Sequence, residues 1–173
     1  KKEVGTEGLE EAAKTYWEGQ LLEPLQNMSG LKGEEHATRL LVAELFTKNT
    51  LTPHENRSLY EHRSTLNRLL KSITWRDKVI SKLIYLTEQL NNDDQLKDII
   101  AILEEISTDG DIDVWKKIGD VNHKLLRYEA AIIAWDKINY EGLLYYHAKS
   151  ELEKRKENYS NYIVWVGMFI MEA

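Results

Sequence analysis

Apolar residues recur along most of the chain at steps of three and four, with polar residues between them. This spacing places the apolar side chains on one face of a helix, and we find no convincing strand in the pattern. Turn-forming residues and helix caps divide the pattern into about nine helical segments. We expect helices over residues 7–27, 34–48, 53–72, 74–91, 92–106, 113–125, 128–138, 140–156 and 160–173.

Several helix starts carry recognisable caps. Thr52 and Glu55, with a proline directly after Thr52, form the signature of a capping box. Residues 107–111 break the pattern, and Asp111 or Asp113 can cap the helix that follows by accepting from its free backbone N–H groups. Ser160 can cap the last helix in the same way.

Residues 113–138 form the most specific unit in the sequence, two short helices joined by a tight turn. Only residues 126 and 127 separate two apolar stripes, which leaves room for an antiparallel helical hairpin. Gly119 and Ala131 are small enough to let the two backbones come close. We expect Trp115 and Trp135 to interlock around them. The stripes consist of Val114, Trp115, Ile118, Val121 and Leu125, and of Tyr128, Ala131, Ile132, Trp135 and Ile138.

This hairpin resembles a tetratricopeptide repeat over residues 113–146, about one repeat of roughly 34 residues. The positions that match the motif of that family are Trp115, Ile118, Gly119, Ala131 and Trp135. The sequence departs from the motif at Asn122, Ile138 and Leu143, where the family usually has Tyr, a small residue and Pro. The resemblance implies hairpins that bury their apolar faces against neighbours, with the first helix of each pair lining a concave surface.

Composition agrees with an all-α protein. The 173 residues include two prolines and nine glycines, which favours helices over a turn-rich β fold. We expect a single all-helical domain over residues 1–173, built of antiparallel hairpins stacked as an α-solenoid or an irregular bundle. Residues 1–107 would form a bundle part and residues 112–173 the tetratricopeptide-like hairpins. The chain begins without Met and ends in an apolar run, so we expect a fragment of a longer protein.

Charge and cysteine content exclude several classes of function. The formal net charge is −6, which makes nucleic acid an unlikely partner. The absence of cysteine removes disulfides, thiolate metal sites and thiol nucleophiles. No apolar run approaches the roughly 18 residues of a membrane span. We therefore expect a soluble, cytoplasmic protein that binds no membrane.

We interpret the chain as a non-enzymatic interaction module that binds a protein or peptide, or another domain of its parent chain. On the resemblance above, the first helix of the hairpin would expose a mixed-charge face able to clamp an extended peptide. The same face has a plainer interpretation as a solvated surface. Its residues are Asp113, Lys116, Asp120, His123 and Lys124.

Two alternative functions stay open. Arg57 and His62 resemble the Arg-x4-His motif of the HEPN family of helical ribonucleases, which implies metal-independent RNA cleavage by this pair. Ser58 stands where that family usually has Asn, Asp or His, and His62 also suits a core position. The order of a helical linker before tetratricopeptide-like hairpins also resembles a regulatory segment of a multidomain signalling ATPase.

Other chemical signals are weaker. Asp109, Asp111 and Asp113 imitate the first half of a calcium loop, but Val114 replaces the glycine that the loop requires. Helix capping explains these aspartates better. The sequence has no phosphate-binding loop, and its five histidines show no metal-ligand spacing. We expect no cofactor and no metal.

Overall fold

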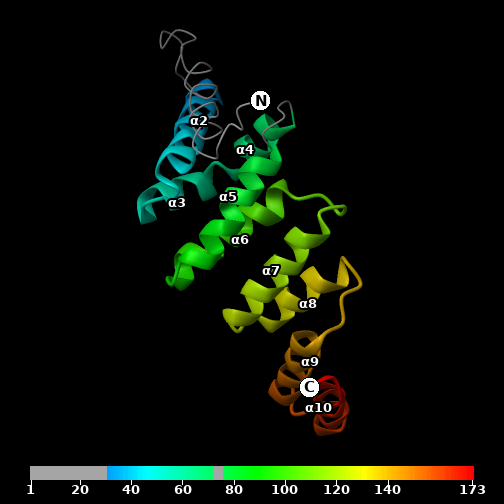
Figure 1. The fold of residues 1–173 in the computed structure, drawn as a ribbon. Coiled ribbons are helices and arrows are strands. Elements are labelled where there is room, and N and C mark those ends of the chain that lie inside the picture. The colour runs from blue at the N-terminus through cyan, green and yellow to red at the C-terminus, as the bar shows by residue number, and fades with distance from the viewer. Residues whose placement is uncertain (1–30, 72–75) are drawn as a thin grey trace, which may run out of the picture. The chain divides into compact units, whose positions relative to one another are not determined.

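The computed structural model describes residues 31–71 and 76–173, and it is helical in both ranges (Figure 1). These residues form nine α-helices, α2 to α10, and no strand. The all-α class is therefore confirmed, with the helices packed against one another. The chain divides into two compact units, Lys1–Ile106 and Ser107–Ala173. The helix expected over residues 7–27 lies outside the described residues.

In the first unit, three of the five described helices pack against α6. The helices are α2 (Leu31–Lys48), α3 (Pro53–Glu61), α4 (Arg63–Leu70), α5 (Arg76–Gln89) and α6 (Asp93–Ile106). α3, α4 and α5 each contact α6, and α2 contacts α3, α4 and α5. The apolar stripe of α6 is buried, as its spacing predicts. The buried residues of this stripe are Leu96, Ile99, Ile100, Leu103 and Ile106.

The capping box at the start of α3 is confirmed. The Thr52 hydroxyl accepts from the Glu55 N–H at 3.2 Å, and the Glu55 carboxylate accepts from the Thr52 N–H at 3.3 Å. The single helix expected over residues 53–72 is wrong. The chain leaves the helical conformation at His62, with φ −96° and ψ 16°, and continues as α4. The break lets two short helices each contact α6.

The second unit contains two helical hairpins in succession. They are α7 (Ile112–Lys124) with α8 (Tyr128–Asp136), and α9 (Leu143–Arg155) with α10 (Tyr159–Glu172). Each helix contacts the next one along the chain, and α7 also contacts α9 (Figure 1). The break at residues 107–111 and the turn at residues 126–127 are confirmed.

The two hairpins repeat one backbone design at an interval of 31 residues. Leu143 opens α9 31 residues after Ile112 opens α7, and Tyr159 follows Tyr128 by the same interval. Both turns contain a residue in the left-handed region, Leu126 with φ 59° and Glu157 with φ 56°. In both, an N–H donates to a carbonyl five residues earlier in the chain, from 127 to 122 and from 158 to 153, each at 2.9 Å. This bond pattern is that of a Schellman turn.

At Gly119 the structure places the Trp135 side chain directly against α7. Trp135 is fully buried, and a Cβ added to Gly119 would lie 2.6 Å from the indole Cε2. Trp115 is held differently, at the beginning of α7. Its Nε1 donates to the Thr108 carbonyl at 2.9 Å, and the Lys137 ammonium lies 4.3 Å from its ring centroid. The structure therefore seats Trp135 on Gly119 and anchors Trp115 to the preceding loop.

Two of the expected side-chain caps are wrong. Asp111 occupies the N-cap position of α7 but makes no side-chain cap, because its Oδ2 accepts from the Thr108 N–H at 2.6 Å and hydroxyl at 3.0 Å. The carboxylate thus closes the turn before the helix. At α10 the cap is Asn158, whose Oδ1 accepts from the Asn161 N–H at 3.4 Å, in place of Ser160.

Candidate functional site

The five residues proposed from the sequence lie along one side of α7. Asp113 and Lys124 are exposed at its two ends. The expectation that all five are exposed is wrong for Lys116, Asp120 and His123, which are half-buried and bond to neighbouring side chains. Helical spacing alone keeps these three off the apolar stripe, but the following helices pack close enough to cover part of them.

Asp120 is the central polar group of this face. Its Oδ2 accepts from the Lys116 ammonium at 3.0 Å, and its Oδ1 accepts from the Trp135 indole N–H at 3.2 Å. The hydrogen bond that Lys116 donates to Asp120 raises the pKa of Lys116 above its ordinary 10.5. The Lys116 ammonium also lies 5.1 Å from the ring centroid of Tyr140. The carboxylate therefore orients a lysine at the surface and holds the core indole of α8.

A pair of histidines joins α7 to α9. His123 Nε2 and His147 Nδ1 lie 2.9 Å apart, so one ring donates to the other. The His123 ring also lies 5.3 Å from the ring of Tyr128 and 6.0 Å from that of Trp135, measured between centroids. Burial, together with the nearby His147, lowers the pKa of His123 below its ordinary 6.5. The polar side of α7 is thus continuous with that of α9.

Arg57 and His62, the candidate ribonuclease pair, lie in different surroundings. The Arg57 guanidinium pairs with Asp98 of α6 at 2.9 Å and with Glu61 at 3.5 Å, and it lies 4.5 Å from the Tyr60 ring centroid. Arg57 lines a shallow hollow of about 600 Å³, and His62 does not. His62 Nδ1 is buried and has no hydrogen-bond partner among the described residues. The hollow that Arg57 lines therefore does not bring this cation and this imidazole to one phosphate.

The aspartates before α7 serve the turn and its surroundings. Asp111 is bonded to Thr108 as described, and Asp109 pairs with Lys137 at 3.7 Å. Across residues 31–71 and 76–173, no cluster of three or more His, Asp or Glu side chains could hold a metal ion. In the same ranges, no helix is both long enough and apolar enough to cross a membrane.

Sequence reasoning missed two members of the α7 surroundings, Tyr140 and His147. His147 occupies the position in α9 that Lys116 occupies in α7, 31 residues earlier. Comparison of the chain with itself at that interval could have pointed to it, but few residues are identical between the two hairpins.

A second hollow, of about 510 Å³, lies beside the α7–α8 turn and is lined by Arg127 and Arg155, among others.

No protein-family model matches this sequence, and searches of curated proteins and of solved structures found no significant match. The resemblance to a tetratricopeptide repeat and that to a signalling ATPase segment therefore stay predictions.

Proposed function

We propose that residues 107–173 act as a helical interaction module that binds a protein or peptide segment on the α7–α9 face. We define this face as Asp113, Lys116, Asp120, His123 and Lys124 of α7 with His147 of α9. The observation that carries the proposal is the His123–His147 hydrogen bond, since it joins the first helices of two successive hairpins into one polar surface.

The face is polar, partly exposed and held in place before any partner arrives. Lys116 is oriented by Asp120, which is itself bonded to the buried indole of Trp135. Ordering of these side chains therefore costs less on binding than it would for solvated ones. This arrangement supports a binding surface in preference to the plain solvated face that the sequence also allowed.

The distribution of charge indicates the polarity of the partner. Asp113 and Lys124 are the exposed ends of the face, and eleven helical residues at about 1.5 Å each separate them by about 16 Å. An extended peptide rises about 3.3 Å per residue, so about five residues span that distance. A peptide with a basic residue near Asp113 and an acidic residue near Lys124 complements the face.

This function is the scaffold role that the tetratricopeptide resemblance implies, and the two stacked hairpins support it. The interval of 31 residues is shorter than the roughly 34 of that family. The proposal therefore depends on the geometry of α7 and α9 and does not require membership of the family.

A charge-exchange variant tests the proposal. Asp113→Lys with Lys124→Glu reverses both ends of the face without changing the net charge, and both residues are exposed. Glu129→Lys with Lys156→Glu is the matched control, because these are exposed charges away from the face. Asp120 and His123 are left intact because they hold neighbouring helices.

The measurement is affinity capture from extract of the source cells, with mass spectrometry of the recovered proteins. We expect at least one partner to be recovered by the wild type and by the Glu129/Lys156 control, and to be lost with the Asp113/Lys124 variant. Recovery of the same partners by all three proteins would show that the α7–α9 face does not bind them. Circular dichroism confirms that both variants keep the helical content of the wild type.

A further inference from the structure

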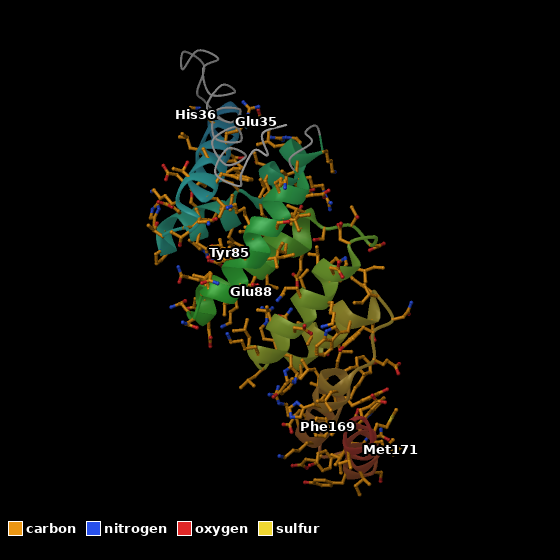
Figure 2. The ribbon with its side chains drawn as sticks, viewed as in Figure 1. Glu35, His36, Tyr85, Glu88, Phe169 and Met171 are labelled. Atoms are coloured by element: carbon orange, nitrogen blue, oxygen red, sulfur yellow. The ribbon has the colours of Figure 1, made fainter. Side chains whose placement is uncertain are left out.

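The last helix, α10, is strongly apolar and yet contains no buried residue. One side of it packs on α9. Trp165 stacks on Tyr146 with centroids 6.2 Å apart, and the Phe169 ring lies 5.7 Å from that of His147. Figure 2 places Phe169 at the junction with α9 and Met171, which is 87% exposed, at the outer side of the helix. The opposite side of α10 leaves large apolar side chains in solvent.

We define the α10 outer face as Tyr159, Ile163 and Ile170, which recur at helical spacing. Tyr159 is 62% exposed, Ile163 68% and Ile170 65%. Such a contiguous apolar surface is uncommon on a monomer and marks an interaction site.

The internal repeat shows what occupies the same surface one hairpin earlier. Tyr159 and Ile163 correspond, at the interval of 31 residues, to Tyr128 and Ile132 of α8. Tyr128 and Ile132 are each only 6% exposed, because α9 covers them. At these two positions α9 lies on α8, whereas no helix among the described residues covers α10.

A neighbouring position provides an internal reference. Ile133 of α8 is 58% exposed, and its counterpart Val164 of α10 is 57% exposed. Ile133 borders a hollow that Leu152 and Arg155 of α9 also line, so it lies at the edge of the contact with α9. The large difference in exposure between α8 and α10 is therefore found at the positions that α9 covers on α8.

The side chains of α9 indicate the chemistry of a matching helix. It contacts α8 through a buried cluster to which it contributes two adjacent tyrosines, Tyr145 and Tyr146, and the small Ala148. The Arg155 guanidinium lies 4.9 Å from the ring centroid of Tyr128. A helix covering α10 would place an aromatic pair and a small residue against Ile163 and a cation over Tyr159.

We propose that the α10 outer face is the docking site for an amphipathic helix of a partner, with the side-chain pattern of α9. The helix would pack on α10 as α9 packs on α8 and would extend the series of hairpins by one element. This surface is separate from the α7–α9 face, so the failure of one proposal leaves the other standing.

The probe is a synthetic peptide of residues 141–158, which reproduces α9 with its flanking turns. It is titrated unlabelled into the ¹⁵N-labelled chain of 173 residues, and amide chemical shifts are followed, since they report even weak binding. We expect saturable shifts confined to α10. Ile163→Glu should weaken this binding about tenfold or more, because the carboxylate would have to be desolvated in an apolar contact.

Val164→Glu is the matched control, because it places the same charge one residue away on the same helix. We expect it to bind the peptide like the wild type. Absence of shifts, shifts centred on α8, or equal binding by Ile163→Glu would each overturn the proposal. Sedimentation velocity without peptide supplies a second readout. A concentration-dependent dimer that Ile163→Glu abolishes would make a second copy the occupant and would also overturn it.

Discussion

Replacement of Gly119 by alanine tests whether Trp135 is seated on the backbone of α7 as described. A Cβ at this position would lie 2.6 Å from the indole Cε2, well inside contact distance, and Trp135 is fully buried and has little room to move. Alanine favours a helix interior by about 1 kcal/mol over glycine. Overpacking of a core costs about 1–3 kcal/mol, and displacement of the indole from Asp120 removes a hydrogen bond worth about 1 kcal/mol.

The net effect we expect is a loss of about 1–3 kcal/mol in the free energy of unfolding. Gly167→Ala in α10 is the matched control, because a Cβ there meets no atom within 4 Å. This substitution should gain about 1 kcal/mol from helix propensity alone. The same glycine-to-alanine change should therefore lower the free energy of unfolding at Gly119 and raise it at Gly167.

Urea unfolding followed by tryptophan fluorescence measures both variants. A Gly119→Ala protein that unfolds at the same urea concentration as the wild type, or at a higher one, would refute the close packing. A second test combines the change with Trp135→Leu. In that background the added methyl group has room, so we expect Gly119→Ala to lose most of its penalty.

The remaining predictions concern single side chains of the described helices. Because burial holds the pKa of His123 below 6.5, the unfolded chain binds more protons, and the melting temperature should fall as pH drops through 6.5; His123→Gln should reduce that fall. Asp120→Ala should lower the free energy of unfolding, measured in urea, by about 1–2 kcal/mol, because two hydrogen bonds are lost. Asp113 is exposed on the same helix, so Asp113→Ala should change this free energy by less than about 0.5 kcal/mol. Asn122 is fully buried with no side-chain hydrogen-bond partner among the described residues, so Asn122→Leu should stabilise the protein by about 1 kcal/mol, and a decrease would show that the amide has a role. Thr52→Ala should cost about 1 kcal/mol by removing the cap of α3, measured by the urea midpoint.

Features set by neighbouring residues were predictable from the sequence. The capping box of Thr52 and Glu55 and the loop before α7 needed only local rules. The close packing at Gly119 could be predicted because a glycine within the apolar stripe of one helix leaves space for a large side chain of the next helix, here Trp135.

Features set by long-range packing were not predictable. His62 lies in a segment whose helical period continues on both sides, and only the packing of α3 and α4 shows that the chain breaks there. The half-burial of Asp120 depends on the indole of α8, and that of His123 on His147 of α9. The periodicity of residues along one helix does not show which residues of another helix will contact it.

In the second unit, consecutive helices pack on one another, which favours rapid folding. Most of its contacts join helices separated by short turns, and each of these closes a small loop at little entropic cost. Proteins rich in such local contacts fold in microseconds to milliseconds. The α7–α8 hairpin, with its fully buried Trp135, is the natural starting point, and α10, with no buried residue, should be the last helix to form and the first to exchange its amide hydrogens.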